Sequence, residues 1–165
     1  MNWSRTILDG IVMCLIFNIT VALLWLIVPN AFSNMLPPEI RKAAPKRERR
    51  EVIILACVLY PLWVGLLAYS VVSACLAEIT GFWNLFWTTY IEMFFVNLGD
   101  FFGLDWWFRE KMKDRIMIPG TENCEAWNTK KWMLTLGIPE HGFAWTFFVC
   151  PILGFICAGI GMLIR

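Results

Sequence analysis

The residues with the clearest capacity for chemistry lie in one apolar stretch, residues 90–109. Four side chains within it end in a carboxylate or an amide: Glu92, Asn97, Asp100 and Asp105. A charged side chain at the centre of a bilayer costs about 2.5–3.5 kcal/mol on insertion scales, so such residues face a bundle interior or a wet cavity. Buried carboxylates can carry protons or, when ionised, bind cations. The stretch therefore predicts an acidic site inside a membrane.

Projection as an α-helix places two of these acids on one face. At about 100° per residue, Glu92 and Asp100 fall together, and Asn97 lies about 60° from Asp100. Gly99 and Gly103 share this face, and glycine lets another helix or a ligand approach the backbone. We therefore expect a polar groove along this helix. The alternative is that the polar side chains only hydrogen-bond to neighbouring helices and fix their pairing.

Two residues outside the stretch extend the candidate site. His141 is the single histidine of the chain. It begins the last predicted span, so it is expected to meet Asp100 and Asp105 at the cytoplasmic face of the membrane. Oxygen ligands with one imidazole suit a hard or borderline metal. Glu122, in the segment 116–125, is expected to cap the groove from the cytoplasm. The alternatives are a solvated interfacial histidine and an ordinary surface turn.

The elements that must position these residues are transmembrane helices. The chain has 165 residues, 59% of them hydrophobic, and its apolar residues form long runs of the kind that span membranes. The runs predict an all-α polytopic membrane protein, a four-transmembrane-helix bundle in a single integral membrane domain over residues 1–165. The predicted spans cover about 7–28, 52–76, 82–104 and 143–164.

The second long connection carries helix signals of its own. We expect the third span to continue into the cytoplasm as an amphipathic helix, along which Asp105 pairs with Arg109 four residues later. A short surface helix over residues 129–136 should follow. Gly137 and Pro139 are stop signals, and they predict that this helix ends before the last span begins.

The basic residues predict the orientation. The loops 29–51 and 105–142 carry six Lys or Arg each, whereas the opposite side carries only Arg5 and Arg165. Because Lys and Arg concentrate in cytoplasmic loops, we expect both loops in the cytoplasm and both termini outside, in the plasma membrane. The same basic residues can attract anionic lipid headgroups. The net charge of +1 gives no indication of nucleic-acid binding.

The last predicted span is rich in small residues: Gly154, Ala158, Gly159 and Gly161. Small residues let helices pack closely. We expect this face to contact a second copy of the chain in a homo-oligomer, with packing inside the monomer as the alternative. The lipid bilayer is the other expected partner.

Three classes of function stay open. The first is a binding or transport protein whose groove binds or conducts a cation, a proton or a small amphiphile. The second is a membrane enzyme acting on a lipid or isoprenoid at the cytoplasmic face, with Asp100, Asp105, Glu122 and His141 as acid–base or metal groups. The third is a structural or accessory subunit. The sequence has no P-loop, GxGxxG, H-E-x-x-H or G-x-S-x-G motif, and it predicts no particular cofactor.

Overall fold

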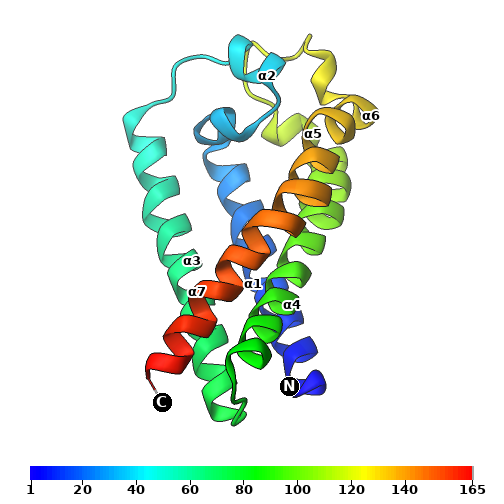
Figure 1. The fold of residues 1–165 in the computed structure, drawn as a ribbon. Coiled ribbons are helices and arrows are strands. Elements are labelled where there is room, and N and C mark those ends of the chain that lie inside the picture. Colours follow the sequence, from blue (N-terminus) through cyan, green and yellow to red (C-terminus); the bar gives the residue numbers. More distant parts are fainter. Residues whose placement is uncertain (165) are drawn as a thin grey trace.

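The computed structural model describes residues 1–164, and this part of the chain is built from helices without strands (Figure 1). Three helical runs are long and apolar enough to cross a membrane. They are α1 (Trp3–Ile27), α3 (Arg49–Leu76) and the continuous run Thr129–Leu163. The expected all-α class is confirmed, and these three helices fit a multi-pass membrane protein.

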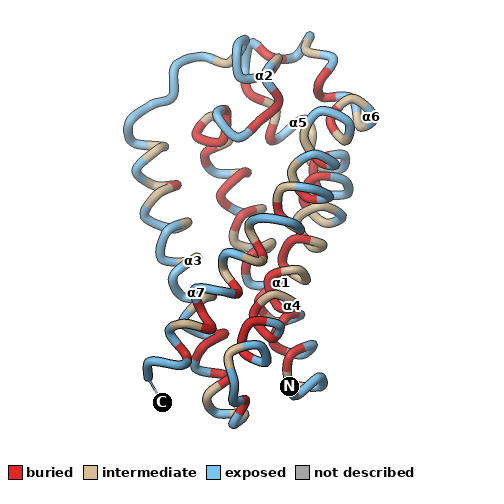
Figure 2. Tube along the Cα trace, viewed as in Figure 1, coloured by how far each residue is buried: buried red, intermediate tan, exposed pale blue. Residues whose placement is uncertain are grey.

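A further helix, α4 (Phe82–Gly99), occupies the centre of the bundle. It packs on α1 and on α7 (Cys150–Leu163), the end of the last helical run. Figure 1 places the start of α1, the end of α7 and the 77–81 turn at one end of the bundle, and the long connections at the other. In Figure 2 buried residues concentrate on α1 and α4, whereas α3 is largely exposed. The central position of α4 explains why it can carry polar side chains.

The outward faces of the long helices are apolar. Their exposed side chains are large hydrophobic residues, which is expected of a surface that contacts lipid. They include Leu8, Leu15, Ile19 and Leu23 on α1, Val64 and Val72 on α3, and Ile152, Phe155 and Ile156 on α7.

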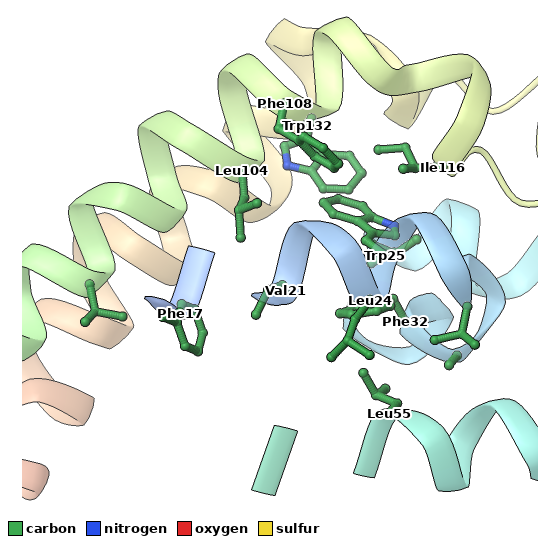
Figure 3. Close-up of a cluster of buried hydrophobic side chains, with 14 of the residues drawn as sticks. Phe17, Val21, Leu24, Trp25, Phe32, Leu55, Leu104, Phe108, Ile116 and Trp132 are labelled. Carbon is green, nitrogen blue, oxygen red and sulfur yellow. The ribbon is translucent and has the colours of Figure 1, made fainter. Parts of the chain in front are cut away.

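Short helices close the loop end of the bundle. They are η1 (Pro29–Met35), α2 (Pro38–Ala43), α5 (Arg109–Ile116), η3 (Glu125–Trp127) and α6 (Thr129–Trp132). Asn128 caps α6 by accepting a hydrogen bond from the Lys130 backbone N–H at 3.0 Å. Beneath these helices lies a hydrophobic cluster that includes Trp25, Phe32 and Trp132 (Figure 3). This cluster joins the loop end to α1.

The predicted stop at Gly137 and Pro139 is wrong. The helix continues from α6 through η4 (Met133–Val149) into α7, so it begins at residue 129 rather than 143. The η4 segment is π-helical, with the Cys150 N–H donating to the Trp145 carbonyl five residues earlier. Proline clashes with the preceding turn of an α-helix, and a wider turn is one way to accommodate Pro139. Gly137 is buried against Phe101, so tertiary packing supports the helix where propensity does not.

The small residues of α7 pack inside the monomer. A Cβ on Gly154 would lie 3.1 Å from the Phe86 carbonyl oxygen, and one on Gly161 would lie 3.0 Å from the Leu85 side chain. Ala158 is fully buried. At Gly159 a Cβ would meet no atom within 4 Å. The face expected to contact a second copy is therefore largely occupied by α4.

Replacing Gly154 by leucine should destabilise the bundle, because the added side chain must displace the Phe86 ring and backbone. Overpacking of this kind costs about 1–3 kcal/mol. We expect a lower apparent Tm for Gly154→Leu in detergent, and no comparable change for the matched variant Gly159→Leu. If Gly159→Leu instead dissociated an oligomer and Gly154→Leu left the Tm unchanged, the small residues of α7 would contact a second copy of the chain.

Candidate functional site: a buried acid–histidine cluster

Two carboxylates of the site share a face because the helix that carries them is π-helical. This segment, η2 (Asp100–Phe108), continues α4, and the Arg109 N–H donates to the Leu104 carbonyl five residues earlier. Positions five apart are about 140° apart around an α-helix, but only roughly 50° apart in a helix with i→i+5 hydrogen bonds. Asp100 and Asp105 therefore lie on one side, which the α-helical projection did not predict.

His141 joins these two acids from the opposing helix η4. One ligand atom from each of Asp100, Asp105 and His141 lies within 4.8 Å of the others. His141 Nε2 is 3.3 Å from Asp105 Oδ2. Asp105 is 6% exposed and His141 is 4% exposed, whereas Asp100 is half-buried. We call these three residues the acid–histidine cluster.

Asn97 fixes the orientation of the imidazole. Its Nδ2 donates to the His141 carbonyl at 3.0 Å, and its Oδ1 lies 2.8 Å from His141 Nδ1. An amide oxygen can only accept, so Nδ1 carries the ring proton and Nε2 of the neutral ring is an acceptor. Asp105 Oδ2, which faces Nε2, has no hydrogen-bond partner among the described residues. Two acceptors thus face each other across a space that requires a proton or a cation.

The spacing of these two acceptors suits a metal ion. Zinc bonds to imidazole nitrogen and carboxylate oxygen are about 2.0–2.2 Å long. An ion at such a distance from Nε2 and Oδ2, which are 3.3 Å apart, would see them at roughly 105°, close to a tetrahedral angle. Asp100 would supply the third ligand, and further positions would stay open.

Arg109 holds the backbone that carries Asp105. Its side chain is fully buried, with Nε donating to the Asp105 carbonyl at 2.9 Å, and the other nitrogens reaching the Trp127 carbonyl and Thr129 Oγ1, also at 2.9 Å. The guanidinium lies over the Trp132 ring at 5.2 Å. The prediction of an ion pair between Arg109 and the Asp105 carboxylate is therefore wrong. The guanidinium donates hydrogen bonds to groups of α6 and η3, and the Asp105 carboxylate faces the site.

Burial and hydrogen bonding shift the pKa values of Arg109 and Glu110, which lie at the start of α5. Burial lowers the pKa of the Arg109 guanidinium, and the adjacent Glu110 partly opposes this effect. The Thr129 hydroxyl donates to Glu110 and lowers the pKa of that carboxyl. Arg109 and Glu110 both bind Thr129, so together they connect α5 to α6 beside the cluster.

A cavity of about 190 Å³ opens from the cluster into the bundle. Its polar end is formed by the cluster together with Glu140, and Met35, which is 51% exposed, lies at its rim. Its walls are aromatic and aliphatic side chains from α1, η1, α3, η2, α6 and η4. They are Phe17, Val21, Trp25, Phe32, Leu36, Leu59, Trp63, Leu104, Trp132, Leu136 and Trp145.

Glu92 does not join the cluster. It is fully buried and accepts a hydrogen bond from Ser70 of α3, whose hydroxyl also lies 2.8 Å from Thr89 Oγ1. It does not line the cavity. The continuous groove expected from Glu92 to Asp100 is therefore replaced by two separate polar sites, and the contacts of Glu92 connect α3 to α4.

Glu122 also lies apart. It is exposed in the turn after α5 and accepts a hydrogen bond from the Gly120 N–H at 2.9 Å. This bond and that from its own backbone N–H lower the pKa of its carboxyl. The expected cap over the groove is formed instead by η1 and α6, which supply Phe32, Met35 and Trp132 to the cavity.

Two features of the site were missed at the level of sequence. One is Glu140 at the polar end of the cavity. The other is the row Trp132, Leu136 and Glu140, spaced four residues apart on one helix face. The signal was the spacing itself. It was hidden because Gly137 and Pro139, between these residues, were interpreted as a helix stop.

Asp9 forms a separate buried site at the other end of the bundle. It accepts hydrogen bonds from Arg5 Nε at 2.9 Å, from Tyr69 Oη at 2.7 Å and from Ser73. Arg5 and Asp9 belong to α1, and Tyr69 and Ser73 belong to α3. All of these hydrogen-bonding groups have protein partners, so the arrangement serves to pair the two helices.

Comparisons with protein-family models, with curated proteins and with solved structures found no match. The chemistry of the acid–histidine cluster is therefore the basis for assigning a function.

Proposed function

We propose that this is an integral membrane protein that binds a divalent cation through Asp100, Asp105 and His141. The observation that carries the proposal is the opposition of His141 Nε2 and Asp105 Oδ2, two acceptors 3.3 Å apart in a buried site. A buried polar group without a partner is costly, and a cation between them satisfies both. The imidazole is oriented by Asn97, as the outer-shell partner of a ligating histidine usually is.

The ligand set selects a class of metal. Carboxylates suit hard cations such as Mn²⁺, whereas imidazole suits Zn²⁺ and Fe²⁺. Two carboxylates with one imidazole therefore favour borderline divalent ions of this group over Ca²⁺ or a soft ion. Three protein ligands leave coordination positions open, as in catalytic rather than structural sites. The alternative to a bound metal is a proton on His141 Nε2. The protonated imidazole would then make an ion pair with Asp105.

We also propose a four-span topology for α1, α3, α4 and the final helix. Its support is that α4 packs between α1 and α7, both within runs of membrane-spanning length, so α4 shares their depth in the bilayer. The basic residues of loops 29–51 and 105–142 favour cytoplasmic loops and external termini. The cluster then lies near the cytoplasmic side, where the same basic residues can contact anionic headgroups.

Replacing Asp100 by asparagine tests the proposal. We expect the protein, purified without a histidine tag, to bind one Mn²⁺ per chain in an EPR titration. Asp100→Asn should weaken binding at least about 10-fold, the lower end of the range for partners outside the first coordination shell, because the amide removes the negative charge of a proposed ligand. The matched variant Glu122→Gln should bind like the parent. Unchanged Mn²⁺ affinity in Asp100→Asn, or a loss of affinity only where the helical circular dichroism is also lost, would contradict the proposal.

A further inference from the structure

We infer that the cavity beside the cluster binds an apolar molecule that ends in an uncharged oxygen group, an alcohol or a carbonyl. This inference rests on the proposed metal site, because the oxygen would occupy one of the metal's open coordination positions. The apolar body would lie between the aromatic walls. The ligand class follows from three independent features of the cavity: its walls, a donor without an acceptor and the charge at its polar end.

The walls suit an apolar body. Trp63 lies between two other rings, with centroids 5.2 Å from Phe17 and 5.5 Å from Trp145, and Trp25 lies 6.0 Å from Trp132. These contacts hold the rings in fixed orientations. A concave, mostly apolar surface with a few polar groups at one end is typical of small-molecule sites.

Two tryptophans that line the cavity, Trp25 and Trp132, each have an indole Nε1 without a hydrogen-bond partner among the described residues. The Trp132 side chain is fully buried, and in Figure 3 its nitrogen lies on the edge of the ring that faces Leu104, another cavity residue. In Figure 3 the Trp25 nitrogen lies on the ring edge away from Leu104, so Trp132 is the donor that indicates an oxygen acceptor. A buried N–H without an acceptor costs about 1–3 kcal/mol. An oxygen at the polar end of the ligand would accept this hydrogen bond.

The charge of the polar end excludes charged headgroups. Asp100, Asp105 and Glu140 supply three carboxyl groups, so two of them in ionised form already balance a divalent cation. An anionic headgroup would add a like charge at close range, which is unfavourable in a site of low dielectric constant. An ammonium group would compete with the metal and could not accept from Trp132, because it has donors only. A neutral oxygen adds no charge to the polar end and can accept the hydrogen bond from Trp132.

The position of the cavity fits entry from the bilayer. Its wall includes Leu59 and Trp63 of α3, the least buried of the three helices of membrane-spanning length, and the exposed Met35 lies at its rim. Molecules with an apolar chain and one polar oxygen concentrate in the membrane. We therefore expect such a ligand to enter the cavity from the bilayer, past α3.

The test uses 1-decanol deuterated at its first carbon, added to the Mn²⁺-loaded full-length protein. We expect deuterium modulation of the Mn²⁺ electron spin echo that saturates with decanol concentration. Deuterated decanoate should give none. Trp132→Phe should weaken decanol binding about five- to tenfold, the effect of one neutral hydrogen bond, with Mn²⁺ affinity unchanged. Trp107→Phe, at an exposed tryptophan of η2 outside the cavity, is the matched control and should bind decanol like the parent.

The outcomes separate the two proposals. Failure to bind Mn²⁺ would overturn the metal site itself. Bound Mn²⁺ without saturable deuterium modulation would overturn the ligand inference alone. Equal modulation from decanoate would contradict the uncharged headgroup. An unchanged decanol affinity in Trp132→Phe, or an equal loss in Trp107→Phe, would contradict the assigned donor.

Discussion

Replacing Asp105 by asparagine is expected to abolish metal binding and to leave the fold at least as stable as before. The carboxylate is a proposed ligand, so we expect a loss of Mn²⁺ affinity of at least about 100-fold, at the upper end of the range for partners outside the first coordination shell. The amide can turn its Nδ2 toward His141 Nε2, 3.3 Å from the present carboxylate oxygen. It then donates a hydrogen bond where two acceptors now face each other, which contributes about 1 kcal/mol.

This stability effect distinguishes a metal site from a protonated pair. If the metal-free protein held a His141 imidazolium beside an Asp105 carboxylate, Asp105→Asn would leave a buried unpaired charge and lower the stability by about 3–5 kcal/mol. Thermal unfolding of the metal-free variant therefore decides between the two. Asp114→Asn, on the exposed side of α5, is the matched control for loss of one carboxylate. A marked drop in Tm for Asp105→Asn alone would contradict the account.

Replacing Gly99 by alanine is expected to separate α1 from α4. A Cβ at this position would overlap Cys14 Sγ and lie 2.5 Å from Asn18 Nδ2, both of which belong to α1. Such overpacking costs about 1–3 kcal/mol or more. Because Asp100 is the next residue, we also expect the Mn²⁺ affinity to fall. The measurements are Tm in detergent and an EPR titration.

The matched variant for this prediction is Gly103→Ala, since a Cβ at Gly103 would meet no atom within 4 Å. It should change neither stability nor metal binding appreciably. The double variant Cys14→Ala, Gly99→Ala removes the closer of the two clashes and should recover part of the lost Tm, because residues in contact couple energetically. Equal losses for Gly99→Ala and Gly103→Ala would contradict this description of the helix contact.

The sequence predicted what depends on hydrophobicity and composition. Long apolar runs predicted the helices α1 and α3, and the third span was expected to continue as an amphipathic helix, as α4, η2 and α5 do over residues 82–116. These features follow from local properties of the chain. The expected proximity of Asp105 and His141 also followed from topology alone, since one ends a predicted span and the other begins the next.

The local geometry of the site required the structure, because two helices change their pitch. The α-helical period assigned Asp100 to the face of Glu92, whereas the π-helical turn of η2 directs it toward Asp105. Pro139 was interpreted as a helix stop because proline has a low helix propensity. The helix nevertheless continues past Pro139, because packing between η2 and η4 stabilises it there. Arg109 was expected to pair with the Asp105 carboxylate, but its side chain pairs with Glu110 and donates to the Asp105 carbonyl and to groups of η3 and α6. Tertiary contacts overrode local rules in each case.

The most direct test of the metal site is the electron spin echo of one bound Mn²⁺. Because His141 is the only histidine, an imidazole nitrogen coupled to the metal identifies the site without ambiguity in protein free of a histidine tag. We predict nitrogen modulation in the parent protein and its loss in His141→Gln. Mn²⁺ that binds stoichiometrically without nitrogen modulation, or with modulation that persists in His141→Gln, would contradict the assignment of the acid–histidine cluster as the metal site.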